Sequence, residues 1–208
     1  MNARTMSVAA FLTATLIGWT ATTSMAGVKA DPALGLKMSM RKLWEEQIVY
    51  TRNYIISSLA GLEDVDKVEE RLLRNPDDIG WAIKPYYGDA VGDSLASFLR
   101  NHIYWTEQVV IASKAGNETG LARAWSSWAF TRHEIAKLLS RANPNLVQDD
   151  LDTMLQKHLD LTKAEVEARL NKDWRADIRA YDDVHANILM FADALSAGIA
   201  KQFPGKFK

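Results

Sequence analysis

The spacing of apolar residues constrains this chain most, because almost every segment repeats them at steps of three and four residues. Such spacing places apolar side chains on one face of a helix, and no stretch alternates as a strand would. The predicted fold class is therefore all-α, an antiparallel helical bundle of about four long helices plus short connecting helices. The helices are expected at about 39–60, 89–114, 121–140, 148–170 and 174–203, with shorter helical pieces starting near Glu63 and at an N-cap, Asn75.

The first 26 residues predict export. Arg4 is their only charged residue, an uncharged apolar run follows, and the run ends in Ser-Met-Ala. This pattern is typical of a signal peptide cleaved after Ala26, which predicts a periplasmic or secreted protein with no membrane span after cleavage. A single membrane anchor is the alternative. The expected organisation is a signal peptide at 1–26, a flexible segment at 27–38, one helical domain at 39–204 and a C-terminal tail at 205–208.

Composition limits the chemistry that the chain can perform. The formal net charge is −1, and loss of Arg4 makes it −2, so no nucleic-acid partner is predicted. The sequence contains no Cys, which excludes disulfides, thiolate ligands and thiol catalysis. Any metal ion would depend on His, Asp, Glu or Met side chains.

The last helix carries polar residues on its expected apolar face. Counting in helical steps from Ile178 to Leu189 places Asp182 and His185 on that face. A charged and a titratable group there need partners, since burial without them costs several kcal/mol.

Turn positions predict which polar residues meet. If the chain reverses near Gly116, Pro144 and Asn171, residues equally far from a turn lie at about equal height. Three histidines from three helices then share one layer, Thr131 lies beside His102, and several carboxylates lie within two turns. The predicted metal ligands are His102, His158, Asp182, His185, Glu134 and Glu165, with Gln47, Thr131, Thr162 and Tyr181 around them.

Clusters of histidine and carboxylate from facing helices are how such folds hold metals, and Zn, Cu and Fe all suit these ligands. We therefore expect an exported protein that binds a transition metal for buffering, sensing or delivery. The alternative is a non-catalytic structural or protein-interaction module, with an unknown protein partner, in which the same side chains form only a hydrogen-bonded core network. An enzyme would also need an open metal position.

Several known site types are absent from the sequence. There is one acid-x-x-His pair, Asp182 and His185, whereas a ferritin-like di-iron site needs two Glu-x-x-His pairs and two further Glu. No Cys-x-x-Cys-His motif predicts haem c, and no Gly-rich loop predicts a nucleotide.

Long segments resemble a family of exported bacterial helical proteins of unassigned function. The resemblance covers about Arg41 to Pro204 and includes LWEEQIVYTRNYIISSLAGL, RLLRNPDDIGWAIKPYYG and RLNKDWRADIRAYDDVHANILMFADALSAGIAKQFP. It implies an inward-facing histidine cluster, although relatives often have His where this chain has Gln47 and Asn187. Some relatives carry a glycosyltransferase label, which this sequence does not support because it has no phosphate-gripping motif.

Overall fold

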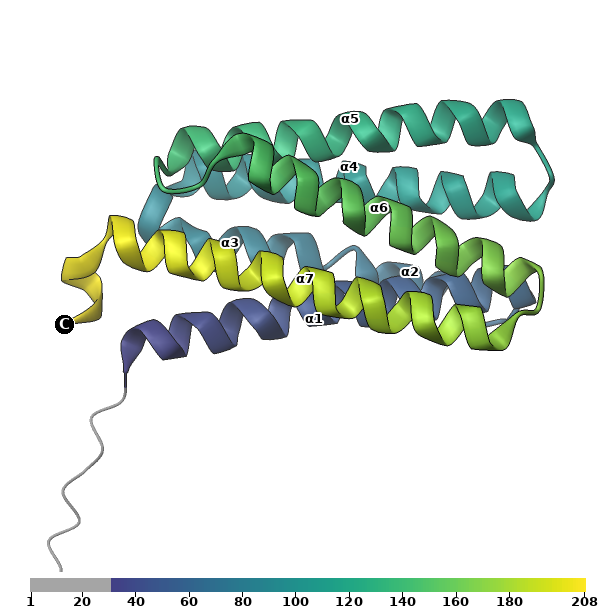
Figure 1. Ribbon diagram of the computed structural model, residues 1–208, viewed down its shortest axis with the longest axis horizontal. Coiled ribbons are helices and arrows are strands. Elements are labelled where there is room, and N and C mark those ends of the chain that lie inside the picture. Colours follow the sequence, from purple (N-terminus) through teal and green to yellow (C-terminus); the bar gives the residue numbers. More distant parts are fainter. Residues whose placement is uncertain (1–30) are drawn as a thin grey trace, which may run out of the picture.

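The computed structural model describes residues 31–208, and all of its regular structure is helical (Figure 1). The all-α prediction is therefore confirmed for this range, whereas the predicted signal peptide and residues 27–30 lie outside it. The elements are α1 (Pro32–Ala60), α2 (Val65–Leu72), α3 (Asn75–Tyr87), α4 (Asp89–Lys114), α5 (Glu118–Ala142), α6 (Gln148–Leu170), α7 (Trp174–Gln202) and a short 3-10 helix, η1 (Pro204–Phe207).

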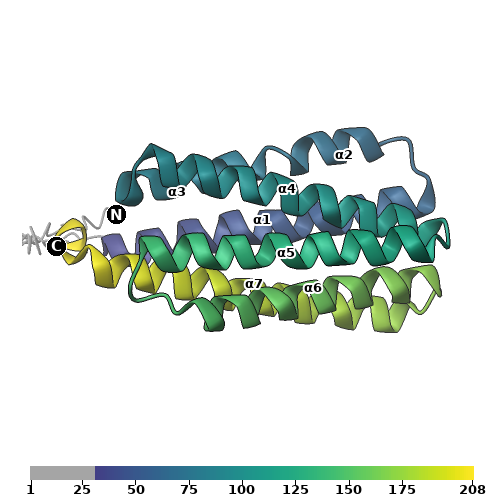
Figure 2. The ribbon, with the colours of Figure 1, turned by 90° about the horizontal axis from the view of Figure 1, so that it is seen from above.

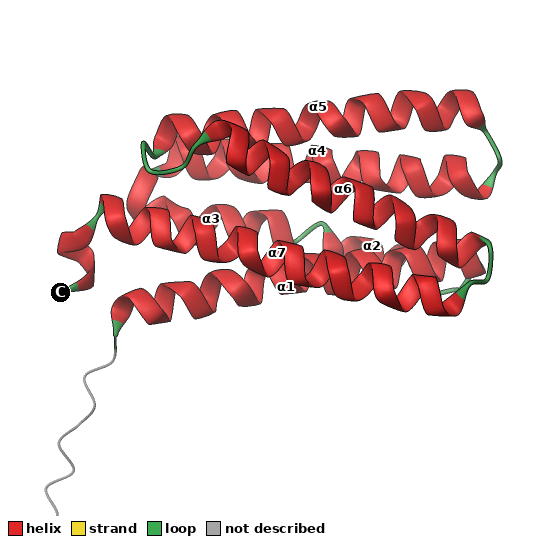
Figure 3. Cartoon of the chain, in the orientation of Figure 1, coloured by secondary structure: helices red, strands yellow, loops and turns green. Residues whose placement is uncertain are grey.

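The long helices α1, α4, α5, α6 and α7 pack side by side, with their connections gathered at the two ends (Figures 1 and 3). The shorter α2 and α3 follow one another along the flank that α1 and α4 present (Figure 2). Ile79 and Ile83 of α3 are fully buried in the main core. Residues 63–88, which connect α1 to α4, therefore pack against the long helices mostly as α2 and α3.

The first helix is longer than the sequence pattern predicted. It begins at Pro32, not near Ser39, because the side chain of Asp31 accepts a hydrogen bond from the Ala33 amide and Pro32 fits the first helical position. Residues 32–38 are therefore helical, and their prediction as a flexible segment was wrong. The helix ends as expected at Gly61, whose φ of 68° is in the left-handed region.

Two other local predictions also need correction. Asn75 is not an N-cap: it is the first residue of α3, fully buried, and its side chain donates a 2.9 Å hydrogen bond to the Leu43 carbonyl. The C-terminal residues are not a separate tail, because the ring of Phe207 stacks on Tyr86 at 5.8 Å. The first contact joins α3 to α1, and the second joins η1 to α3.

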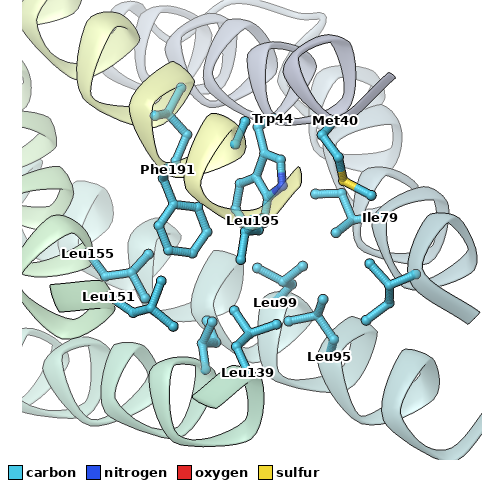
Figure 4. Packing of buried hydrophobic residues seen from close by; sticks show 14 of the residues in the cluster. Met40, Trp44, Ile79, Leu95, Leu99, Leu139, Leu151, Leu155, Phe191 and Leu195 are labelled. Atoms are coloured by element: carbon cyan, nitrogen blue, oxygen red, sulfur yellow. The ribbon is translucent and has the colours of Figure 1, made fainter. Parts of the chain in front are cut away.

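The main core is built from large side chains that all the long helices contribute. The indole of Trp44 meets the ring of Phe191 edge-on at 4.9 Å, joining α1 to α7 (Figure 4). Leucines from α4, α5 and α6 surround this pair. Burial of each such side chain contributes roughly 1.5–3 kcal/mol.

Glycines allow α3 and α4 to lie unusually close together. A Cβ atom added to Gly80 would lie 2.6 Å from the carbonyl oxygen of Gly92, and one added to Gly92 would lie 2.7 Å from that of Gly80. Neither helix tolerates a side chain at this crossing without moving.

None of the helices within residues 31–208 combines the length and apolar character needed to cross a membrane.

Candidate functional site: a buried polar layer

The last helix faces the core with a different stripe from the predicted one. Asp182 is exposed, and Ile178 is 51% exposed. His185 is only partly buried, and its Nε2 lies 2.9 Å from Oε1 of Glu45 at the surface. In the N-terminal half of α7, the inward face consists of Asp177, Ala180, Val184, Asn187 and Ile188.

The prediction of Asp182 and His185 as inward metal ligands was therefore wrong. Two polar residues, Asp177 and Asn187, belong to the true inward stripe and interrupt its apolar pattern. The apolar Ile178 lies outside that stripe and shifts the apparent face by one residue. Burial of polar side chains among partners from other helices is not visible in the periodicity of one helix.

Glu134 also lies away from the predicted cluster. It is on the surface of α5, where its Oε1 accepts from Lys137 Nζ at 3.3 Å. The predicted six-residue cluster is thus not assembled. Only His102 and His158 of that set come together, with Thr131 and Gln47 beside them.

His102 is the centre of a complete hydrogen-bond network. The indole N–H of Trp128 donates to its Nε2 at 3.0 Å, and its Nδ1 lies 3.1 Å from the hydroxyl oxygen of Thr131. Because Nε2 accepts, the proton of the neutral ring is on Nδ1 and is donated to Thr131. The Thr131 hydroxyl donates in turn to the Trp128 carbonyl at 2.7 Å. Both nitrogens of His102 are therefore occupied.

The prediction that Thr131 lies beside His102 is confirmed. The turn between α4 and α5 falls where the sequence placed it, so residues equally distant from Gly116 are level. Trp128 completes the network one turn earlier on α5, although the sequence assigned it only to the core.

His158 reaches the same layer from α6. Its ring stacks on that of His102, with centroids 5.7 Å apart and an interplanar angle of 27°. In the described part of the chain, its buried Nδ1 has no hydrogen-bond partner. Thr162, also predicted near the site, is buried and donates from its hydroxyl to the His158 carbonyl at 2.9 Å. It stabilises the turn of α6 and leaves the ring free.

A small cavity of about 10 Å³ lies against both histidines. Trp44 and Gln47 of α1 also line it, and both carry a buried polar atom that has no partner within residues 31–208: Nε1 of Trp44 and Oε1 of Gln47. Within the described range, the residues around this space therefore carry one unpaired N–H donor, one unpaired amide oxygen and Nδ1 of His158, which donates or accepts according to the tautomer of its ring. Asn187, next in the chain to the lining residue Ile188, has a similarly unpaired Oδ1.

Burial keeps both imidazoles neutral. It lowers the pKa of His158 to about 4. It also lowers the pKa of His102 well below its usual value, with a smaller contribution from the neighbouring His158. The rings are therefore uncharged at neutral pH and available as acceptors only through nitrogens that carry no proton.

Glu165 belongs to a second buried polar group, an ion network that joins α1, α6 and α7. The guanidinium of Arg52 donates to Glu165 at 2.5 Å and to both oxygens of Asp177 at 3.0 and 3.2 Å. Arg169 donates to Asp177 at 2.8 Å. Both carboxylates are only 2% exposed. Tyr181, the remaining predicted residue, lies with its ring 4.5 Å from the Arg52 guanidinium carbon.

This network explains why Glu165 was wrongly assigned to the histidine layer. Its Oε1 accepts from Arg52, and burial raises the pKa of Glu165 while the guanidinium opposes that change. Sequence analysis did not identify Arg52 or Asp177. A signal was present, since Arg52 follows Gln47 and Ile48 by about one turn on the apolar face of the first helix.

Ligand chemistry at the histidine layer is limited by these contacts. Within residues 31–208, no group of three His, Asp or Glu side chains is arranged to hold a metal ion. The ligand atoms without a partner in residues 31–208 that belong to cavity-lining residues are Nδ1 of His158 and Oε1 of Gln47. Comparison of the chain with known protein families, curated proteins and solved structures finds no match. The interpretation therefore depends on geometry alone.

Proposed function

We propose that this chain is an exported, non-catalytic helical-bundle module, in which the layer around His102 fixes how the helices pack and the protein acts by binding a partner. The observation that carries this proposal is the Trp128–His102–Thr131 network. It occupies both ring nitrogens of His102 on α4 with two neighbours from the adjacent helix α5. A metal ion bound through His102 would need one of those nitrogens.

The alternative function, transition-metal binding for buffering, sensing or delivery, has its own support at His158. Its unpaired Nδ1 and the unpaired amide oxygen of Gln47 belong to residues lining one cavity, and imidazole with oxygen ligands suits Zn, Cu(II) or Fe. Such a site would have fewer ligands than the six that the sequence predicted. Binding there would add to stability by mass action.

One experiment separates the two functions. The chain is purified without a His tag from the periplasm, and its metals are measured by inductively coupled plasma mass spectrometry before and after titration with Zn, Cu and Fe. The structural function predicts no stoichiometric metal. About one metal per chain, lost in His158→Ala but retained in the surface control His133→Ala, would establish the metal-binding alternative.

Export is tested on the same material. The sequence of residues 1–26 supports cleavage after Ala26, which predicts a mature N-terminus at Gly27. Intact-mass measurement of the periplasmic protein identifies that terminus. A full-length chain found only in the membrane fraction would instead indicate an anchor.

A further inference from the structure

A surface cavity of about 350 Å³ lies between the second half of α4 and the first half of α5. This volume is in the range of pockets that hold small molecules. It is separate from the histidine layer, and none of its lining residues was part of the predicted site. Its existence is explained by small side chains, since Ala112 and Ala124 are buried at its base and Gly120 adds no side chain.

The cavity has an aromatic and aliphatic wall from α4, while Gln108, Asn117, Thr119 and Arg123 add polar groups to its lining. Tyr104 and Trp105 of α4 meet edge-on, with ring centroids 5.0 Å apart and an interplanar angle of 73°. Ile111, two turns further along α4, is 49% exposed and Tyr104 is 48% exposed. Large apolar groups with half their surface in water, lining one concavity, favour binding of a flat apolar body.

The charge of the cavity comes from one residue. Arg123 of α5 is the only charged side chain that lines it, and this residue forms no ion pair within residues 31–208. A guanidinium presents its N–H groups in a planar fork that matches a carboxylate. Nothing on the lining opposes an anion by charge.

We infer that this cavity is a binding site for a small aromatic carboxylate, whose ring lies against Tyr104, Trp105 and Ile111 while its carboxylate pairs with Arg123. The inference is independent of the proposed structural role of His102. It assigns a ligand class to a module for which no small-molecule site was predicted.

The test uses the ¹⁵N-labelled periplasmic protein and 2-naphthoate, followed by amide and indole chemical shifts. We expect saturable shifts centred on Trp105, Gly120 and Arg123, with a Kd of about 1 mM or lower, as ligand efficiency allows for a compound this small. Arg123→Gln should weaken 2-naphthoate binding about fivefold, the upper range for an exposed ion pair. The matched control is Arg179→Gln, an exposed arginine on α7, which should leave the Kd unchanged.

A neutral probe and a second variant separate the two halves of the site. The uncharged 2-naphthamide should bind the parent protein and Arg123→Gln equally, whereas Ile111→Ala should weaken both probes about threefold through lost apolar contact. The inference is overturned if 2-naphthoate causes no saturable shifts at about 5 mM. It is also overturned if the shifts fall elsewhere, or if Arg123→Gln and Arg179→Gln have the same effect.

Discussion

The stacked imidazoles of His102 and His158 join α4 to α6, yet the surroundings of the two rings differ. His102 is bonded through both nitrogens, to Trp128 and Thr131, whereas Nδ1 of His158 has no partner within the described residues. The rings are compatible with one another only while neutral, because a proton on either would place a charge in a dry layer. Burial accordingly lowers the pKa of both.

The first prediction is that the two buried histidines contribute less to stability in mild acid, an effect opposite in sign to that of Glu107 below and therefore measured by comparing variants. The unfolded chain takes up protons on these histidines below a pH of about 6.5, whereas the folded chain resists them until about pH 4 for His158. The stabilising contribution of the two neutral rings is therefore fully present above the unfolded pKa and decreases as pH falls below it. The His158 ring should account for about 1 kcal/mol of lost unfolding free energy between pH 7.5 and 5.5, and His102 acts in the same direction.

Urea denaturation at the two pH values measures this loss. His158→Gln removes one titrating ring, so its unfolding free energy at pH 5.5 relative to pH 7.5 should be about 1 kcal/mol higher than that of the parent. His133→Gln changes a surface ring and should not show this difference. Equal pH dependence in the parent and His158→Gln would contradict the neutral-layer interpretation.

The second prediction concerns Glu107 on α4, a buried carboxyl group whose effect on stability changes with pH in the opposite direction to that of the histidines. It is 7% exposed, and within residues 31–208 its Oε1 has no hydrogen-bond partner. Burial, with a smaller contribution from Glu69, raises its pKa to about 7. The folded chain then keeps a proton that the unfolded chain releases near pH 4.5, so this group lowers stability as pH rises from about 4.5 to 7.

Replacing that carboxyl group by an amide removes the penalty. Glu107→Gln should be more stable than the parent by about 2 kcal/mol at pH 8, with the gain vanishing near pH 4. Unfolding free energies across this pH range give the result. Glu63→Gln, in an exposed loop, is the matched control, and a gain that did not depend on pH would refute the assignment of the titration to Glu107.

The third prediction concerns the ion network of Arg52, Glu165 and Asp177. Asp177→Asn removes the carboxylate paired with Arg169 and one of the two paired with Arg52, which keeps Glu165, and should lower the unfolding free energy by about 3 kcal/mol. Asp193→Asn removes the partner of Arg41 in a pair that is about one-third exposed, and should cost less than about 1 kcal/mol. Similar losses in the two variants would mean that burial does not make the ion pairs of Asp177 more important for stability than an exposed pair.

The fourth prediction concerns the crossing of α3 and α4. In Gly80→Ala the new Cβ would meet the Gly92 carbonyl at 2.6 Å, so the helices must separate, at a cost of about 1–3 kcal/mol. Gly35→Ala on α1 meets nothing within 4 Å and should be neutral or slightly stabilising, because Ala favours helix. Thermal unfolding compares the two. An unchanged Gly80→Ala would indicate that α3 is free to move.

The sequence predicted the fold class, and the turn residues predicted one contact of the site correctly. Gly116 lies at the turn between α4 and α5, so counting back from it pairs His102 with Thr131. The same counting placed His158 opposite His185, but His185 lies off the inward face of α7 and pairs with Glu45 instead. Height depends only on helical rise, whereas the face depends on which polar residues find partners.

Those partners are far away in the chain. Asp177 is buried because Arg52, 125 residues earlier, pairs with it, and His185 stays near the surface because Glu45 is there to accept from it. One helix read alone shows only an interrupted apolar stripe. Pairings of this kind are decided when helices meet, and no local pattern contains them.

The Trp128–His102–Thr131 network has a consequence for how α4 and α5 align. Apolar ridges of Leu and Ile can mesh at several offsets, since dispersion contacts have little direction. A slip of one helical turn, about 5.4 Å, would carry both partners beyond hydrogen-bond reach of the imidazole and leave it alone in a dry core. The histidine therefore favours a single alignment of α4 and α5 and makes alignments shifted by one turn unfavourable.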